Sequence, residues 1–188
     1  MSITPLPSPP VEGLLRLRMS WEEFLQLPER PRTEWVDGEV LVMAPASGPH
    51  GASTVRLGAL LMTHLPGLTI ATEVGVFLPR NRLRAPDLVA VERMPEKGWI
   101  TEPPVLTVEV LSASTRSEDT VRKSMEYAEG GVGQYWIVDP DLRTIDVLAN
   151  AGGSWDVLAH LDDDHPSAEI AVADHGTVPL DLRHVLGT

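Results

Sequence analysis

The chain has 188 residues, of which 43% are hydrophobic, and this suits a single compact domain with a core of its own. It contains no cysteine, which excludes disulfides and thiolate metal sites, and its apolar runs are too short to span a membrane. The formal net charge is −12, with 27 acidic and 15 basic residues, and this disfavours general attraction to nucleic acid.

The chain begins with a proline-rich segment, "MSITPLPSPPVEG", which we expect to belong to a flexible arm over residues 1–18. The segment lacks the basic start and the apolar stretch of a secretory signal, so we expect a cytoplasmic protein. A single domain is expected over residues 19–188, because no internal linker or repeat interrupts it.

The first half of this domain predicts both helices and strands. "SWEEFLQLPE" from Ser20 carries the capping box of a short helix, and "TEWVDGEVLVMAP" predicts a hairpin around Asp37-Gly38. "SGPHGASTVRLGALLMTHL" from Ser47 has the apolar spacing of a helix that ends before Pro66. "LTIATEVGVFLP" predicts a strand, "NRLR" a turn and "APDLVAVE" another strand.

The second half predicts two central strands around a helix. "VLTVEVLS" and "QYWIVDP" are apolar enough for the centre of a sheet. Between them, "TRSEDTVRKSMEYAEGGV" predicts a helix whose inner face carries Val121, Met125 and Tyr127. An edge hairpin across Gly152-Gly153, a further strand or two and a short terminal helix follow. Strands and helices alternate only in part, so we expect a mixed central sheet flanked by helices, an α/β (α+β) fold.

Two carboxylates interrupt these apolar strands. Glu109 is the one charged residue of its strand, and a buried carboxylate is costly unless it is paired or holds a metal. Asp87 lies at the start of the preceding strand. Together they suit Mg²⁺ or Mn²⁺, hard ions that prefer oxygen ligands, polarise a phosphodiester and lower the pKa of bound water. Lys123, in the following helix, is placed to neutralise charge that develops on a phosphate.

Each of these residues also has a structural interpretation. Asp87 follows a proline and, taken alone, caps a turn. Glu109 alone would pair with an arginine, either Arg84 or Arg122, and Lys123 alone would be a solvated helix residue. The metal-site interpretation therefore depends on the three residues as a set.

Several segments taken in order resemble a known family. They are "EWVDGEVLVMAP", "PH" at Pro49-His50, "APDLVAV", "VEVLSAST" and "KSMEYAEGGVGQYWIVDP". This series resembles the Uma family of restriction-type endonucleases, within the PD-(D/E)XK nuclease superfamily. The resemblance implies a restriction-endonuclease-like core, a mixed sheet of four or five strands with helices on both faces, and an N-terminal helix and hairpin.

The resemblance also implies a site. Asp87 and Glu109 would hold Mg²⁺ (or Mn²⁺), and the substrate would be DNA. The superfamily places a lysine two residues after the glutamate, where this chain has Leu111. In the Uma family the lysine stands on the following helix, and the matching residue is Lys123.

Two further residues are expected to support this site. Glu73 is expected beside Asp87 on a neighbouring strand, or else as a cross-strand partner of an arginine. His50, at a helix start, is expected to touch a phosphate or the leaving group, or else only to cap the helix. The acidic residue that the superfamily often takes from its first core helix is missing from residues 51–64, so its role would pass to Glu34 or Glu73.

These features lead to three functional hypotheses, of which the third, a metal-dependent phosphohydrolase of another fold, has the least support. The first is a Mg²⁺-dependent DNA endonuclease, expected as a homodimer that forms through the edge hairpin or the N-terminal helix. The second is a catalytically inactive relative that serves as a binding or assembly module, which the net charge of −12 favours. An arginine rim around the site would favour DNA binding, and its candidates are Arg80, Arg82, Arg84, Arg116 and Arg122.

Overall fold

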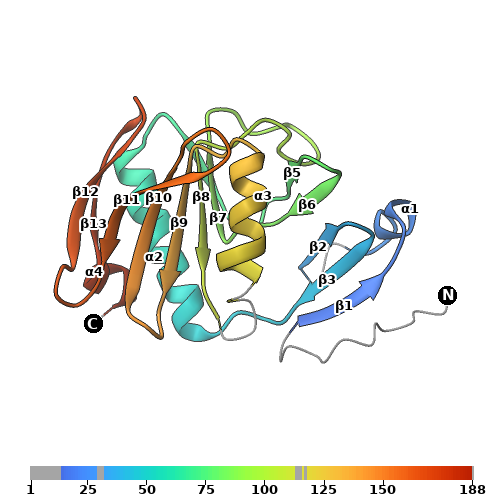
Figure 1. The fold of residues 1–188 in the computed structure, drawn as a ribbon, viewed down its shortest axis with the longest axis horizontal. Coiled ribbons are helices and arrows are strands. Elements are labelled where there is room, and N and C mark those ends of the chain that lie inside the picture. Colours follow the sequence, from blue (N-terminus) through green and yellow to red (C-terminus); the bar gives the residue numbers. More distant parts are fainter. Residues whose placement is uncertain (1–13, 29–31, 113–115, 117, 188) are drawn as a thin grey trace.

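A six-stranded mixed sheet forms the centre of the protein. The structure is a computed structural model that describes residues 14–28, 32–112, 116 and 118–187. The strand order of the central sheet is β11-β10-β9-β8-β7-β4. Helix α2 (Gly48–His64) covers one face, and helix α3 (Ser124–Glu129) covers the other (Figure 1). The predicted mixed sheet flanked by helices is confirmed.

The direction of the strands follows from their connections. Strands β8 and β9 run parallel, and the other neighbouring pairs are antiparallel. A parallel pair needs a long crossover, which here contains α3. The strands of the central sheet are β4 (Thr69–Ala71), β7 (Leu88–Val91), β8 (Leu106–Val110), β9 (Gln134–Asp139), β10 (Thr144–Asn150) and β11 (Trp155–Leu161).

Side chains alternate between two cores along β8. Val108 and Val110 belong to the larger core, which also contains Leu57 and Leu61 of α2. Because successive residues of a strand point to opposite faces, Glu109 points to the face covered by α3. The strand sequence therefore presents a carboxylate to the helix that follows it.

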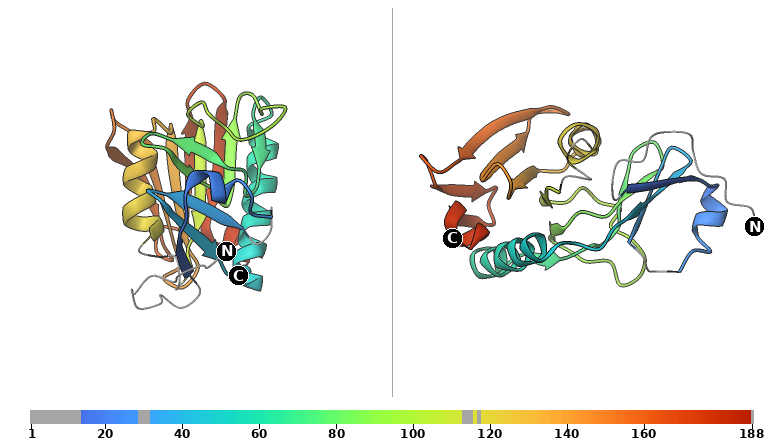
Figure 2. Two further views of the ribbon diagram at one scale, coloured as in Figure 1. Left: turned by 90° about the vertical axis from the view of Figure 1, so that its right-hand side faces the viewer. Right: turned by 90° about the horizontal axis from the view of Figure 1, so that it is seen from below.

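A second, five-stranded sheet lies beside the central one (Figure 2), with the strand order β1-β3-β2-β6-β5. Helix α1 (Trp21–Phe24) has the predicted capping box between Ser20 and Glu23, and the Trp21 ring packs against four other aromatic rings. The strands are β1 (Leu14–Arg18), β2 (Thr33–Val36), β3 (Glu39–Met43), β5 (Val76–Leu78) and β6 (Arg82–Arg84). The predicted N-terminal helix and hairpin are thus confirmed.

The N-terminal arm differs from its prediction where the structure describes it. Residues 14–18 form β1, which pairs with β3, so this part of the expected arm is a strand. Residues 1–13 lie outside the described residues. The pairing gives the backbone groups of this segment partners in β3, which is the physical reason that it is ordered.

The C-terminal elements complete the larger core. Strands β12 (Ser167–Val172) and β13 (Gly176–Asp181) form a hairpin, and helix α4 (Leu182–Leu186) follows it. Gly176 has φ 139°, and a side chain there would meet the His64 carbonyl oxygen at 2.6 Å. Glycine is therefore needed where this hairpin meets the end of α2. Among the described residues, no helix is long and apolar enough to cross a membrane.

Three predicted elements are different in the structure. Residues 68–79, predicted as one strand, form β4 and β5 in separate sheets, and "NRLR", predicted as a turn, contains β6. The predicted helix over 115–132 begins, where it is described, as a π-helix, η1 (Glu118–Lys123). The face turned inward carries the charged residues Glu118, Asp119, Lys123 and Glu126, and Val121 and Met125 are 59% and 62% exposed.

Candidate active site

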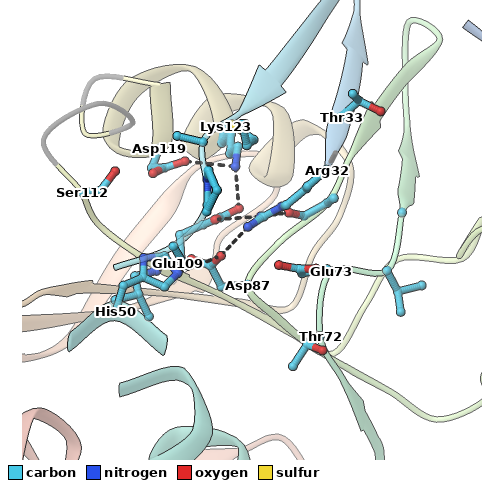
Figure 3. A pocket seen from close by; sticks show the side chains of 18 of the residues that line it. Arg32, Thr33, His50, Thr72, Glu73, Asp87, Glu109, Ser112, Asp119 and Lys123 are labelled. Carbon is cyan, nitrogen blue, oxygen red and sulfur yellow. Dashed lines mark hydrogen bonds and ion pairs between the residues drawn. The ribbon is translucent and has the colours of Figure 1, made fainter. Parts of the chain in front are cut away.

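A cavity of about 1420 Å³ opens where the two sheets meet (Figure 3). Asp87 and Glu109 reach it from the central sheet, Arg32 from the segment before β2, His50 from α2, and Lys123 from the end of η1. The cavity therefore brings together all three predicted catalytic residues, with further charged residues that are not expected there, among them Arg32 and Asp119.

Asp87 and Glu109 lie side by side on the face covered by α3. In the antiparallel register of β7 and β8, Leu88 is opposite Val108, and continuing it by one residue places Asp87 opposite Glu109. The backbone N–H of Val110 donates to Asp87 Oδ2 at 2.7 Å. Asp87 is 4% exposed and Glu109 is 1% exposed. The two strands thus hold two carboxylates together out of water.

Lys123 is the buried counter-ion of this pair. Its Nζ lies 2.9 Å from Glu109 Oε1 and 3.0 Å from both Glu34 Oε1 and Asp119 Oδ1. The Tyr127 hydroxyl donates to the same Glu109 oxygen at 2.8 Å. Burial opposes the charge of Lys123, but the three carboxylates outweigh this effect and raise its pKa above the usual value. Lys123 and Tyr127 together fix the orientation of Glu109.

The two metal-ligand candidates have pKa values that move in opposite directions. Burial raises the pKa of Glu109 to about 8, although Lys123 opposes the shift. The reason is that Lys123 is shared among three carboxylates, and that Asp119 and Asp87 repel the Glu109 charge. Burial acts the same way on Asp87, but its hydrogen bond to His50 and the charge of Arg32 outweigh it and lower the pKa of Asp87 below its usual value. The metal-free pair therefore ionises first at Asp87.

Arg32 lies between the two carboxylates. Its Nη1 is 2.7 Å from Asp87 Oδ1, its Nη2 is 4.0 Å from Glu109 Oε2, and Nη2 also donates to the Ala85 carbonyl. The sequence contained a weak signal for this residue, because Arg32 and Glu34 are two positions apart at a strand and so point to the same side. The signal was missed because the pairing of the two sheets cannot be deduced from the spacing.

The two supporting residues have different outcomes. His50 lies in the first turn of α2, where Ser47 accepts its backbone N–H, and its Nε2 is 3.3 Å from Asp87 Oδ1. Glu73 lines the cavity next to the segment of Asp87, but its predicted place on a strand is wrong, because it lies beyond the end of β4. It lies exposed in the bend between β4 and β5, with φ 56°, and its N–H donates to the Pro86 carbonyl at 3.1 Å.

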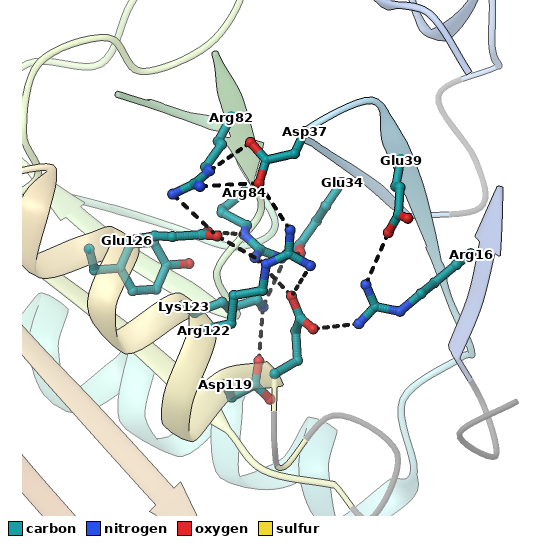
Figure 4. Close-up of polar contacts among 12 residues, drawn as sticks. Arg16, Glu34, Asp37, Glu39, Arg82, Arg84, Asp119, Arg122, Lys123 and Glu126 are labelled. Atoms are coloured by element: carbon teal, nitrogen blue, oxygen red, sulfur yellow. Dashed lines mark hydrogen bonds and ion pairs between the residues drawn. The ribbon is translucent and has the colours of Figure 1, made fainter. Parts of the chain in front are cut away.

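A second ionic cluster lies next to the site (Figure 4). Arg84 is fully buried and contacts Glu34 and Glu118 at 2.8 Å and Glu126 at 2.6 Å. Burial opposes its charge, but these carboxylates hold the pKa of Arg84 well above its usual value. Glu34 belongs to both clusters: burial opposes its ionisation, but Lys123 and Arg84 lower its pKa to about 2. Glu34 therefore connects the N-terminal sheet to the site.

The arginines expected on a rim around the site form ion pairs with carboxylates. The alternative that Glu109 pairs with Arg84 or Arg122 is wrong, because its charged neighbours are Lys123 and Arg32. Apart from Arg84, the expected rim residues make the pairs Arg80–Glu129, Arg82–Asp37, Arg122–Asp37 and Arg116–Asp139. The described arginines near the site thus do not form a rim of unpaired positive charge.

The donor set suits a hard divalent cation with few protein ligands. Arg32 already places positive charge against Asp87, with its Nη2 4.0 Å from Glu109 Oε2. Within residues 14–28, 32–112, 116 and 118–187, no group of three or more His, Asp or Glu side chains is arranged to hold a metal. Mg²⁺ commonly binds through one or two carboxylates, with water and substrate phosphate as its other ligands, so these residues fit it.

Comparisons with known proteins agree with this architecture. An uncharacterized protein of Synechocystis sp. is 33% identical over 154 residues, which cover 75% of this chain and 80% of that protein. A crystal structure from Anabaena variabilis, described as that of "a putative nuclease", has a TM-score of 0.74 at 18% identity and covers 90% of this chain and 98% of its own. This likeness confirms the expected fold. A model of the family Uma2, described as "Putative restriction endonuclease", matches residues 21–174, and the chain therefore belongs to the Uma2 family.

Proposed function

We propose that this protein is a metal-dependent endonuclease that hydrolyses phosphodiester bonds of DNA, with Asp87 and Glu109 as ligands of Mg²⁺ or Mn²⁺. The observation that carries the proposal is the pair of buried carboxylates on one face of the β7–β8 pair, directed at a common cation. The family description and the nuclease with a similar fold support it.

The residues around the bound ion would have separate roles in the reaction. A bound ion would polarise the phosphodiester and activate a water molecule. Lys123 would hold Glu109 in place and add positive charge below the phosphate, while its own burial keeps it from moving into solvent. His50 would contact the phosphate or the leaving group from the first turn of α2, where backbone N–H groups favour an anion.

A specific observation favours the second hypothesis, a catalytically inactive binding or assembly module. Arg32 already neutralises Asp87, and the arginines expected on the rim are paired with carboxylates. The net charge of −12 also opposes DNA binding. In such a module, the ionic clusters would serve only to join the two sheets.

Cleavage of supercoiled plasmid DNA distinguishes the two hypotheses. With Mg²⁺ or Mn²⁺ the wild type should produce nicked and linear DNA, and EDTA or Asp87→Asn should reduce the rate roughly 100-fold or more. Asp164→Asn, which removes an exposed carboxylate, is the matched control and should leave cleavage unchanged. Equal cleavage by the wild type and Asp87→Asn, or no cleavage with any of these ions, would contradict the proposal. We also propose a homodimer, since nucleases of this superfamily that cut both strands tend to work as dimers.

A further inference from the structure

The position of Arg32 conflicts with metal binding at the same carboxylates. Its Nη1 lies 2.7 Å from Asp87 Oδ1, and its Nη2 lies 4.0 Å from Glu109 Oε2. A Mg²⁺ ion sits about 2.1 Å from its oxygen ligands. An ion that takes one oxygen from each carboxylate would therefore lie where the guanidinium now is, and two cations cannot share that place.

The exposure of Arg32 and its Nε suit a group that can leave, although leaving also breaks the hydrogen bond from Nη2 to the Ala85 carbonyl. Its side chain is 19% exposed and borders the cavity, whereas Lys123 is 1% exposed beneath the site. Within the described residues, Arg32 Nε is buried without a hydrogen-bond partner. A buried donor without a partner is unfavourable, so moving the guanidinium into the cavity would let water solvate this nitrogen.

We infer that Arg32 is an internal counter-ion that holds Asp87 and Glu109 together in the metal-free protein and that a divalent cation must displace. This inference rests on the proposed function, because it takes the same two carboxylates as metal ligands. Its consequence is a metal affinity set by competition: Arg32 weakens binding of the free ion. The displaced guanidinium stays in the cavity, where it faces the substrate.

Calorimetric titration of the full chain with Mn²⁺ at neutral pH, after treatment with EDTA, tests this competition. Arg32→Gln should bind Mn²⁺ roughly tenfold more tightly or better than the wild type, because a hydrogen-bonded charged competitor is gone. Arg82→Gln removes an arginine that pairs with Asp37 outside the cavity lining, and it should leave the affinity unchanged. Asp87→Asn should weaken binding at least as strongly as Arg32→Gln strengthens it.

A second measurement does not depend on whether Arg32→Gln folds. In the wild type, the Nε–H signal of Arg32 should shift in a ¹H–¹⁵N spectrum as diamagnetic Mg²⁺ is added, and the signal of Arg82 should not. An unchanged Arg32 signal at saturating Mg²⁺ would overturn the inference, as would Mn²⁺ affinity in folded Arg32→Gln equal to or weaker than in the wild type.

The failure of the inference can be told from the failure of the proposed function. If Asp87→Asn abolishes Mn²⁺ binding but Arg32→Gln does not tighten it, the metal site stands and Arg32 is not its competitor. If Asp87→Asn and Glu109→Gln both bind Mn²⁺ as the wild type does, the ion binds elsewhere, and both the metal site and the competition are wrong.

Discussion

Replacing Glu109 by glutamine tests the electrostatics of the site most directly. The variant cannot ionise at position 109 but keeps an acceptor oxygen for Lys123 and Tyr127. Burial raises the pKa of Glu109 from 4.5 to about 8, so the folded, metal-free protein keeps a proton that the unfolded chain loses. Because the folded state then binds more protons, the wild type should lose stability as the pH rises through this interval.

The size of the effect follows from the width of that interval. One retained proton changes the free energy of unfolding by at most about 1.4 kcal/mol per pH unit, so moving from about pH 5 to about pH 8 costs the wild type at most roughly 4 kcal/mol. Urea unfolding in EDTA should show Glu109→Gln close to the wild type in stability near pH 5 and more stable near pH 8. Glu96→Gln, which removes an exposed carboxylate, should follow the wild type at every pH.

The same pair of proteins tests the metal site. Mn²⁺ binds ionised carboxylates in the folded state, so it should raise the melting temperature of the wild type much more than that of Glu109→Gln. Parallel pH profiles of stability would refute the raised pKa and show that Lys123 keeps Glu109 ionised. An equal shift with Mn²⁺ in both proteins would place the ion elsewhere, for instance on the run Asp162-Asp163-Asp164.

Three further predictions concern the surroundings of the site. Lys123→Met should cost roughly 3–5 kcal/mol in urea unfolding at neutral pH because it leaves three buried carboxylates without their shared cation, and a loss as small as that of the exposed control Arg80→Gln would contradict this. Arg84→Met should also destabilise strongly, but less in mild acid, because the carboxylates that it leaves unpaired can then take up protons; a loss independent of pH would contradict this. Val157→Asp, in the edge strand β11 where Val157 is 67% exposed, should turn the proposed homodimer into a monomer in light scattering, and a monomeric wild type would exclude the dimer.

The two carboxylates could be found from the sequence because each breaks a simple pattern. Glu109 interrupts a strand in which every other residue is apolar or threonine, and Asp87 precedes a second such strand. Alternation along paired strands then fixes the face on which each side chain lies, and the structure shows both on the face covered by α3. The positions of the two carboxylates could be predicted because both depend on one pair of neighbouring strands.

The cations around these carboxylates were harder to predict because they depend on contacts between distant segments. Arg32 reaches Asp87 only because the N-terminal sheet packs beside the central one. Glu73 was misplaced because a residue with φ 56° turns the chain between two sheets, where the apolar pattern suggested one continuous strand. The inner face of the helix differs from its prediction because it carries charged side chains, among them Asp119, Lys123 and Glu126, where the apolar pattern of a helix is expected.

Helix η1 supplies the lysine that the strand of Glu109 lacks. Leu111, two residues after Glu109, lies on the same face and is 4% exposed in the apolar core beside Tyr127. Leu111 also borders the cavity, and Lys123 reaches Glu109 from η1, where Asp119, four residues earlier, pairs with the same ammonium. A buried carboxylate requires a cation at a particular point, and it does not matter which element supplies it. Arg32 meets the same requirement for Asp87, so the metal-free site is stable because the chain supplies its own cations.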